Sequence, residues 1–303
     1  MNIENVEVFL CVFEEKNLTK AAERLFLSQP TVSNRLKALE DELNAKLFIR
    51  NKGVRNVELT PAGEQFLPLA EQWAALYNDI GQIKKETARN DLRIGCPDTL
   101  SDCLLLPLFA EVLYLTPPLH LDITTYHSKE VVRAVAERRV DVSLGFYQRS
   151  ISNVISLPVF REIIRVLLFE PTQELKAKAA VHPSELLRKD EIFTYWSPGI
   201  QQWHDSWWER NEKPYASIDT LPQMKQLMRR PGQWMIIPSY MVDAFSDDRR
   251  FHVKSFSTPA PNRICYLFKH RYPELQTKKN VSMFENRLFE YCKKSDSIEV
   301  ITG

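Results

Sequence analysis

The chain has 303 residues, with 40 Lys and Arg against 39 Asp and Glu and a formal net charge of +1. This balance excludes a polycationic arm or an acidic tail, so any contact with nucleic acid must come from a local patch. The 44% hydrophobic and 26% charged residues are typical of a soluble globular protein, and the length suits two domains of roughly 100–200 residues. None of the eight glycines forms a G-x-G pair or precedes a lysine, which excludes Rossmann and P-loop phosphate cradles.

The five cysteines are odd in number and contain no C-x-x-C pair, which favours a reducing compartment over disulfides or a zinc site. Cys96 and Cys103 are either a redox pair or two small buried hydrophobic residues, and the second interpretation is favoured. The N-terminus shows no basic region before an apolar core, so no signal peptide is expected. The most apolar stretch, Leu104–Leu115, contains Pro107 and Glu111 and is shorter than the about 20 residues of a membrane span. We expect a cytoplasmic protein that does not contact membranes.

Three short helices are predicted at the start of the chain. The first is indicated by apolar residues at helical spacing, namely Val6, Phe9, Leu10 and Phe13. Asn17 is a suitable N-cap for a second helix, Leu18–Phe26. Ser28 is the N-cap of a third helix, with Pro30 in its first turn. Only one or two residues around Leu27 separate the second and third helices, which is the spacing of a helix-turn-helix.

The third helix has two unlike faces. Val32, Leu36 and Leu39 recur at positions that pack inward. The opposite face carries no acid before Glu40, and with the first turn it presents small or hydrogen-bonding residues: Gln29, Pro30, Thr31, Ser33, Asn34 and Lys37. Such a face fits the major groove of DNA, where the start of a recognition helix meets base edges and phosphates. A purely structural three-helix domain remains the alternative.

A wing is predicted directly after these helices. Phe48–Val57 has the pattern of two strands around a polar, glycine-containing turn that exposes Arg50, Lys52 and Arg55. Between positions 28 and 56 there are six bases and three acids. We expect the three wing bases to contact the DNA backbone.

The run from Ala21 to Gly63 resembles the DNA-binding signature of the LysR-type transcriptional regulators. The matching residues are Ala21, Ala22, Leu25, Ser28, Gln29, Pro30, Val32, Ser33, Leu39, Glu40, Leu47, Phe48, Arg50, Leu59, Thr60 and Gly63. Asn44 stands where the family usually has Gly, and Asn tolerates the left-handed conformation of a helix end. Asn34 stands where many members have Arg or another long side chain. The resemblance implies a winged helix-turn-helix that binds double-stranded DNA.

A long helix follows the wing. Its apolar residues are separated alternately by four and three positions: Ala62, Phe66, Leu69, Trp73, Leu76, Ile80, Ile83 and Thr87. This a/d seam favours pairing with a second copy of the chain over docking on the chain's own domain. The resemblance also implies a homodimer through this helix, and two helix-turn-helix units held together read a palindromic site.

After Asn90 short apolar strands alternate with helices. The predicted strands are Leu92–Cys96, Leu119–Tyr126, Asp141–Phe146, Ile163–Phe169, Ile192–Trp196, Met235–Ile237 and Ile264–Phe268. The predicted helices are Leu104–Leu115, Lys129–Glu137, Gln201–Arg210 and Leu221–Met228. The alternation predicts an α/β architecture with largely parallel sheets.

Two segments of this part, Glu130–Gly145 and Met228–Pro238 with Gly232, are similar to the LysR family. The resemblance implies a fold like a periplasmic solute-binding protein, with two lobes, two crossovers and a ligand cleft. We therefore expect an N-terminal all-α winged helix-turn-helix, a long linker helix and a C-terminal two-lobed α/β domain. The boundaries are 1–60 for DNA binding, 61–90 for the linker and dimerisation helix, and 91–303 for the effector domain (lobe I about 91–160 plus 265–303, lobe II about 161–264).

The cleft is expected where strands end and helices begin, because free helix amides suit a small polar or anionic ligand. The candidate effector contacts are Thr99, Leu100, Ser101, His127, Ser128, Trp196, Ser197 and Thr220. Simple helix capping is the alternative for the hydroxyl residues, and a satisfied loop histidine is the alternative for His127. Four tryptophans, Trp196, Trp203, Trp207 and Trp208, suit either core packing or an aromatic-lined pocket.

Three functional classes compete: a LysR-type regulator gated by a small molecule, an enzyme on the same lobes, and a solute-binding or structural module. The sequence has no G-x-S-x-G elbow, H-E-x-x-H pair or Cys/His metal cluster, so we expect no enzyme, no metal and no cofactor. The expected partners are double-stranded DNA, a small-molecule effector and further copies of the chain. The resemblance also implies that dimers assemble into a homotetramer. RNA polymerase is a further expected partner of such a regulator.

Overall fold

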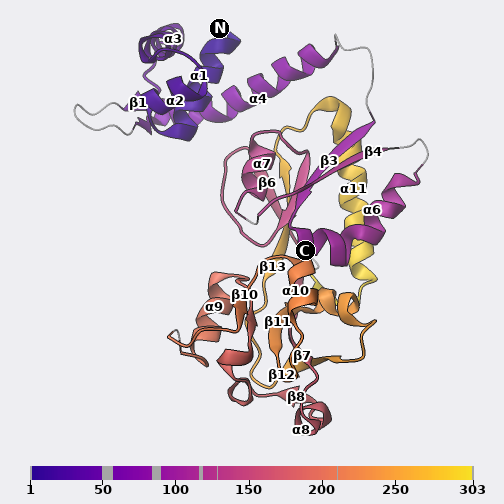
Figure 1. Cartoon of the computed structure of the whole chain (residues 1–303). Helices are drawn as coiled ribbons and strands as arrows, with labels where there is room; N and C mark the ends of the chain where they lie inside the picture. The colour runs from indigo at the N-terminus through magenta and orange to yellow at the C-terminus, as the bar shows by residue number, and fades with distance from the viewer. Residues whose placement is uncertain are drawn as a thin grey trace. The chain divides into compact units, whose positions relative to one another are not determined.

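The computed structural model describes residues 2–49, 57–83, 90–115, 119–127, 129–209 and 211–301 (Figure 1). The chain divides into two compact units. The first contains residues 1–89 with the short segments 151–153 and 270–278, and the second contains the remainder. Among the described helices none is both long enough and apolar enough to cross a membrane.

The first unit is a winged helix-turn-helix followed by a long helix. Its elements are α1 (Ile3–Glu15), α2 (Leu18–Arg24), α3 (Gln29–Glu42), β1 (Phe48–Ile49), β2 (Glu58–Leu59) and α4 (Pro61–Ile83). Val32, Leu36 and Leu39 of α3 are fully buried, which confirms the predicted inward face. Phe9 of α1 lies at the centre of this core, with its ring centroid 5.0 Å from that of Phe66 on α4.

The turn between α2 and α3 is longer than predicted. The Asn17 side chain accepts hydrogen bonds from the N–H groups of Thr19 and Lys20, which confirms the predicted N-cap of α2. However, α2 ends at Arg24 rather than Phe26, because Phe26 has a left-handed backbone (φ 55°) that a helix cannot continue. The turn therefore has four residues, and Ser28 then caps α3 as predicted.

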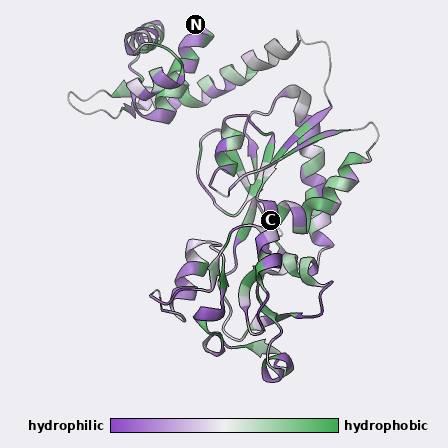
Figure 2. Ribbon diagram, in the orientation of Figure 1, coloured by the Kyte–Doolittle hydropathy of each residue, from purple (hydrophilic) through white to green (hydrophobic). Residues whose placement is uncertain are grey.

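The second unit has two lobes. The first lobe is built on a six-stranded sheet in the order β14-β6-β13-β5-β3-β4. Its elements are β3 (Asp91–Cys96), α5 (Asp98–Leu100), the π-helical turn η1 (Ser101–Leu105), α6 (Leu106–Leu113), β4 (His120–Thr125), α7 (Val131–Ala136), β5 (Val142–Gly145), β6 (Val154–Glu162), β13 (Ile264–His270), α11 (Leu275–Lys293) and β14 (Ile298–Val300). The helix α6, hydrophobic over most of its length in Figure 2, packs against α11, with Phe109 stacked on Phe284 at 6.4 Å.

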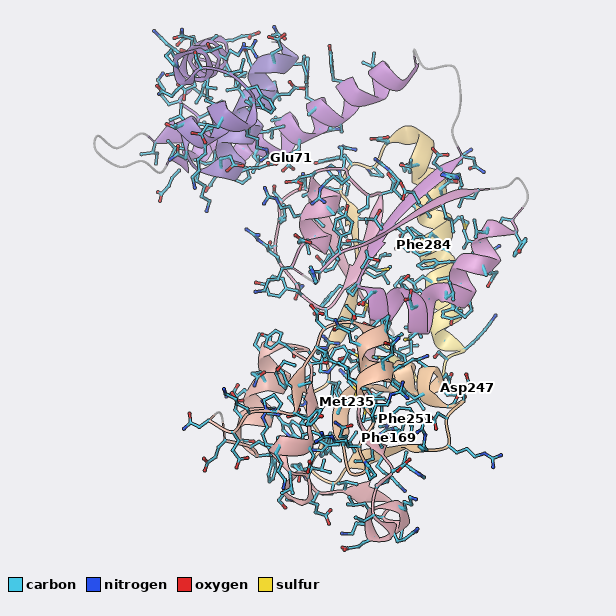
Figure 3. The ribbon with its side chains drawn as sticks, in the orientation of Figure 1. Glu71, Phe169, Met235, Asp247, Phe251 and Phe284 are labelled. Atoms are coloured by element: carbon cyan, nitrogen blue, oxygen red, sulfur yellow. The ribbon has the colours of Figure 1, made fainter. Side chains whose placement is uncertain are left out.

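The second lobe contains a four-stranded sheet in the order β11-β7-β12-β8 and a small β10-β9 sheet. Its elements are β7 (Ile164–Phe169), α8 (Gln173–Ala177), β8 (Ala180–Val181), η2 (Pro183–Glu185), η3 (Arg188–Asp190), β9 (Ile192–Phe193), α9 (Pro198–Asp205), β10 (Ala216–Ser217), α10 (Leu221–Leu227), β11 (Trp234–Pro238), η4 (Ser239–Phe245) and β12 (Phe251–Phe256). Phe169 and Phe251 meet in its core with ring centroids 5.1 Å apart, and buried Met235 belongs to the same hydrophobic cluster (Figure 3).

One expectation about this unit is wrong, and one long helix was missed. The sheets are mixed rather than largely parallel: β7 pairs antiparallel with both β11 and β12, and β5 pairs antiparallel with β13. The reason is that β7 and β12 carry the chain into and out of the second lobe, and β13 returns it to the first. The long C-terminal helix α11 was not predicted, although Val281, Phe284 and Leu288 are buried at helical spacing.

Candidate DNA-binding surface and effector pocket

The outer face of α3 carries the six helix residues predicted to bind DNA. Gln29, Pro30, Asn34 and Lys37 are exposed, and Thr31 and Ser33 are half-buried. The Ser28 hydroxyl accepts from the Thr31 N–H at 3.2 Å and lies 2.7 Å from the Thr31 hydroxyl, so the start of the helix is held by its own cap. The structure thus leaves an exposed, largely uncharged hydrogen-bonding surface on this helix.

The bases around α3 divide into two groups. Arg35 pairs with Glu4 of α1 at 2.6 Å, and Lys46 pairs with Glu40 at 2.9 Å, so both serve the packing of the domain. Lys37 is exposed on the outer face of α3. The predicted wing contacts lie outside the described residues: Arg50, Lys52 and Arg55. The paired strands at the base of the wing are described, with Phe48 opposite Leu59 and Ile49 opposite Glu58.

Glu40, from the Leu-Glu pair of the signature, lies near the end of α3 and joins this helix to the start of the wing. Its carboxylate is buried and accepts hydrogen bonds from the Lys46 ammonium and from the backbone N–H groups of Leu47 (3.0 Å) and Phe48 (3.4 Å). Burial alone would raise the pKa of Glu40, but these hydrogen bonds outweigh burial and hold the pKa below its ordinary value. Asn44, in the turn between Glu40 and the wing, has φ 50°, which confirms the predicted left-handed position. The carboxylate therefore fixes the wing to the end of α3.

Thr60 and Gly63 join the start of α4 to the segment directly before β1. The Thr60 hydroxyl accepts from the Gly63 N–H at 3.0 Å and donates to the Lys46 carbonyl. A Cβ atom at Gly63 would lie 2.2 Å from the Leu47 carbonyl oxygen, so only glycine fits there. These contacts give the Leu-Thr-x-x-Gly segment of the signature a structural role.

The long helix α4 leaves an apolar stripe exposed. Phe66 of the predicted seam is buried in the helix-turn-helix core instead. Further along, the exposed fractions of four seam residues are high: Leu69 (60%), Trp73 (41%), Leu76 (58%) and Ile80 (52%). The described part of α4 ends at Ile83, so Thr87 lies outside the described residues.

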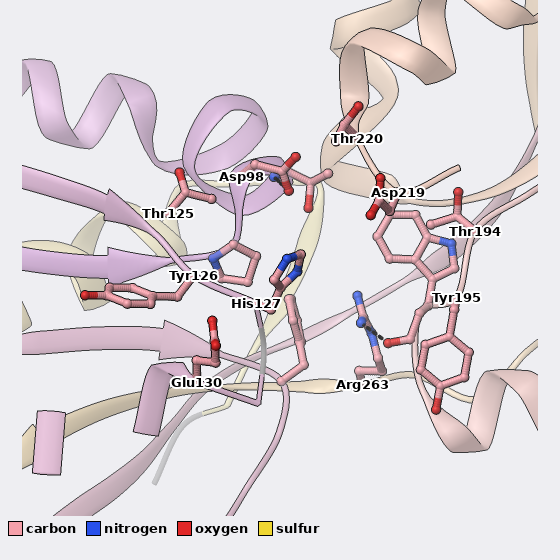
Figure 4. Close-up of a pocket in the computed structure, with 14 residues that line it drawn as sticks. Asp98, Thr125, Tyr126, His127, Glu130, Thr194, Tyr195, Asp219, Thr220 and Arg263 are labelled. Carbon is pink, nitrogen blue, oxygen red and sulfur yellow. Dashed lines mark hydrogen bonds between the residues drawn. The ribbon is translucent and has the colours of Figure 1, made fainter. Parts of the chain in front are cut away.

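A pocket of about 290 Å³ lies within the second unit, between its two lobes (Figure 4). First-lobe segments that follow β3, β4 and β5 line one side, and second-lobe segments that follow β9 and precede α10 line the other. The lining residues are Pro97, Asp98, Thr99, Thr125, Tyr126, His127, Glu130, Phe146, Thr194, Tyr195, Trp196, Asp219, Thr220 and Arg263.

The structure brings four of the eight predicted effector residues together in this pocket: Thr99, His127, Trp196 and Thr220. Leu100 is fully buried in the core of the second unit, and Ser101 is 9% exposed at the start of the π-helical turn. Ser197 is the N-cap of α9 and accepts from the Ile200 N–H at 3.2 Å, so the capping interpretation describes it. Ser128 lies outside the described residues.

Arg263 is the pocket residue that sequence reasoning missed most completely. It lies just before β13, and its guanidinium donates to both carboxylate oxygens of Glu162, with the Nη2–Oε2 distance 2.8 Å. It also donates to the Trp196 carbonyl at 2.6 Å, drawn as a dashed line in Figure 4. Burial alone would lower the pKa of Arg263, but the charge of Glu162 outweighs burial and raises it. No motif marks either residue, because the pair joins positions far apart in the chain.

The tryptophans divide between the two interpretations left open. Trp208 and Trp234 are buried in the second-lobe core, where their rings lie 4.7 Å apart and Trp203 packs at the edge. Trp196 instead lines the pocket and donates from its indole Nε1 to the Ile236 carbonyl at 2.9 Å. Of the four predicted tryptophans, Trp203, Trp207 and Trp208 therefore belong to core packing, and Trp196 belongs to the pocket.

The cysteines are free, and burial governs their chemistry. Burial raises the pKa of Cys96 to about 12 and that of Cys103 to about 12, which favours the unreactive thiol over the thiolate. Across the described ranges, no group of three or more His, Cys, Asp or Glu side chains is placed to hold a metal ion.

The structure thus combines a winged helix-turn-helix, a long helix and a two-lobed α/β unit with a pocket between its lobes. Comparison with known families agrees. Residues 3–64 match the bacterial regulatory helix-turn-helix protein, lysR family, and residues 85–278 match the LysR substrate binding domain. The chain belongs to the LysR family.

Individual relatives cover part of the chain. The HTH-type transcriptional regulator CysL of Bacillus subtilis (strain 168) is 34% identical over 150 residues, which are 48% of each chain. HdfR of Yersinia enterocolitica is 34% identical over 146 residues, 47% of this chain and 48% of that protein. The chain thus matches about half the length of these curated relatives.

Solved structures share the fold over nearly the whole length. A full-length OxyR variant from Pseudomonas aeruginosa has a TM-score of 0.60 at 19% identity, covering 100% of this chain and 98% of that one. A full-length BenM variant has a TM-score of 0.56 at 19% identity, covering 100% and 99%.

Proposed function

We propose that this protein is a sequence-specific transcriptional regulator that binds pseudo-palindromic promoter DNA as a homodimer and responds to a small molecule. The exposed hydrogen-bonding face of α3 is the observation that supports this most directly. A helix face that served only solvation would carry acids and bases, whereas this one presents Gln29, Asn34 and Lys37 without an acid between them. We place the protein in the cytoplasm, where the promoter DNA that it would bind is found.

In this proposal Ser33 and Asn34 meet base edges in the major groove. An Asn side chain makes a bidentate contact with adenine, which is the geometry that specifies a base. The wing bases Arg50, Lys52 and Arg55 hold phosphates and set the position of the domain on the duplex.

The exposed stripe of α4 supports pairing with a second copy of the chain. Leu69, Trp73, Leu76 and Ile80 continue the four-three spacing of a helix pair, and an apolar stripe of this kind is costly to leave in water. The dimer places two recognition helices on two half-sites. Assembly of dimers into a tetramer and contact with RNA polymerase belong to the same proposal.

The effector is proposed to bind in the pocket between the lobes. Thr99 and Thr220 come from opposite lobes and both line the pocket, so a ligand that contacts both would favour an arrangement in which the two lobes close on it. Binding of ligand and binding of DNA are then linked, and the linkage is reciprocal, with a coupling of about 1–3 kcal/mol. Replacing Thr99 with Val keeps the shape but removes the donor, and should abolish the effector response with little change in DNA affinity without effector.

Footprinting of the promoter region upstream of the protein's own gene, followed by titrations on specific and random duplexes, tests the proposal. Affinity should fall steeply with salt on both duplexes. Asn34→Ala should cost about 1–3 kcal/mol at one position of the specific site only, whereas Arg55→Ala should weaken both duplexes alike and flatten the salt dependence. Equal losses on specific and random DNA for Asn34→Ala would contradict the base contact, and no salt-dependent binding at all would contradict the function.

A further inference from the structure

Three carboxylic acids line the pocket between the lobes. Asp98 follows β3, Glu130 precedes α7, and Asp219 precedes α10. Asp98 accepts one hydrogen bond, from the Thr99 N–H at 2.7 Å. Within the described part of the chain, the carboxylates of Glu130 and Asp219 have neither an ion pair nor a hydrogen-bond donor, and both residues are exposed to the solvent of the pocket. Figure 4 shows these three side chains around His127.

The one arginine of the lining does not offset these charges. The Arg263 guanidinium is already neutralised by both oxygens of Glu162, a residue with a fully buried side chain. Its face lies over the rings of Phe146 (4.0 Å) and Trp196 (5.2 Å). The charges of Arg263 and Glu162 cancel, so the three acids of the lining give the pocket a net negative charge.

Two further bases, Arg139 and Lys225, contact groups outside or at the edge of the lining. Arg139 lies over the Tyr126 ring at 5.1 Å but pairs with Glu137 at 3.0 Å. Lys225, on the helix that follows Thr220, places its ammonium over the Phe245 ring at 5.9 Å. Neither base belongs to the lining, so an anion that entered the pocket would meet three carboxylates and, among the described lining residues, no arginine or lysine apart from the paired Arg263.

The rest of the lining suits an organic group that donates hydrogen bonds. The Thr194 hydroxyl oxygen is buried and has no hydrogen-bond partner among the described groups, so it is available to accept from a ligand. Aromatic side chains of Tyr195 and Trp196 lie beside it in the lining. Aromatic faces attract organic cations, and an ammonium group has donors but no acceptor.

We infer that this pocket binds a small organic cation, an amine or a guanidine, rather than the polar or anionic ligand expected from helix N-termini. The helical stretch that begins at Asp98 runs through α5, η1 and α6, and its first turn already carries the Asp98 carboxylate on the Thr99 N–H, so an acid occupies the place that an anion would take. This inference rests on the proposed effector function of the pocket and names the chemical class of its ligand.

Isothermal titration of the full-length protein with agmatine and putrescine, and with succinate as the matched anion, tests the class of ligand. At least one of the two cations should bind, and more weakly as salt rises. The double variant E130Q/D219N should bind that cation about tenfold more weakly, because two exposed charge contacts are lost. The double variant D122N/D247N removes two exposed acids outside the lining and should bind like the wild type.

The outcomes separate this inference from the proposed function. Failure of both cations to bind at millimolar concentration overturns the inference, as does equal binding by E130Q/D219N and D122N/D247N. Succinate binding that strengthens in E130Q/D219N also overturns the cationic class, but it leaves the pocket as an effector site. If the wild-type protein shows no salt-dependent binding to DNA, the proposed function is contradicted, whichever small-molecule probe binds in the pocket.

Discussion

Glu162 and Arg263 form a buried ion pair at the two places where the chain passes between the lobes. Glu162 is the last residue of β6, and Arg263 directly precedes β13. The Glu162 N–H also donates to the Arg263 carbonyl at 2.9 Å, so backbone and side chains join the two connecting segments. Arg263 reaches from there to the Trp196 carbonyl in the pocket wall. The pair thus links the pocket wall to the connections between the lobes.

Removing one member of this pair should destabilise the protein strongly. Arg263→Met leaves the Glu162 carboxylate buried without its partner, which typically costs about 3–5 kcal/mol of the free energy of unfolding. The double variant E162Q/R263M should recover much of that loss, because no unpaired charge remains. Denaturant unfolding of each variant measures both values.

The neighbouring pair of Arg161 and Glu299 provides the control. These side chains are 48% and 52% exposed and lie 3.4 Å apart, so Arg161→Met should cost no more than about 1 kcal/mol. A similar loss for Arg161→Met and Arg263→Met would contradict the special role of the buried pair.

Glu40 should make the stability of the DNA-binding domain depend on pH. Glu40→Gln keeps the shape but loses the charge, and should cost about 1 kcal/mol at neutral pH. The folded-state pKa of Glu40 lies below the ordinary value of 4.5, so its contribution is present above pH 4.5 and is lost as the pH falls through the folded-state pKa. The difference between the wild type and Glu40→Gln in thermal unfolding should therefore shrink in acid. Asp41→Asn, an exposed change on the same helix, should show no such trend.

Gly63→Ala should separate the wing from the start of α4. The added Cβ meets the Leu47 carbonyl oxygen at 2.2 Å, and backbone must shift to admit it, at a cost of about 1–3 kcal/mol. Gly199→Ala in α9 is the matched control, because nothing lies within 4 Å of its Cβ and alanine favours a helix. Equal melting temperatures for the two variants would show that the backbone around Leu47 shifts without loss of stability, which would contradict this prediction.

Charges on the exposed stripe of α4 should produce a monomer. Trp73→Glu with Ile80→Glu places two carboxylates in the proposed seam while leaving the helix-turn-helix core untouched, since both side chains are exposed in the single chain. Sedimentation should show a folded monomer that no longer holds two half-sites. Gln72→Glu, an exposed neighbour outside the seam, should stay dimeric. An unchanged oligomer for the seam variant would place the dimer contact elsewhere.

The sequence by itself determined the features that depend on neighbouring residues. The caps at Asn17 and Ser28 were predicted because an N-cap bonds to amides two or three positions away. Asn44 was placed in the left-handed region because its short polar side chain tolerates that conformation. The inward face of α3 and the exposed part of the α4 stripe followed from helical spacing, which is also local.

Only the tertiary structure decided which residues form the pocket and what charge it has. Asp98, Glu130 and Asp219 come from separate strand ends and helix starts, and Arg263 meets Glu162 across about a hundred residues of chain. Strand order decides which of these ends are adjacent, and it depends on pairings such as β7 with β11 and β12 that no local pattern encodes. The same reason removed Leu100 and Ser197 from the lining. Sheet packing buried the first, and the start of α9 took the hydroxyl of the second as its cap.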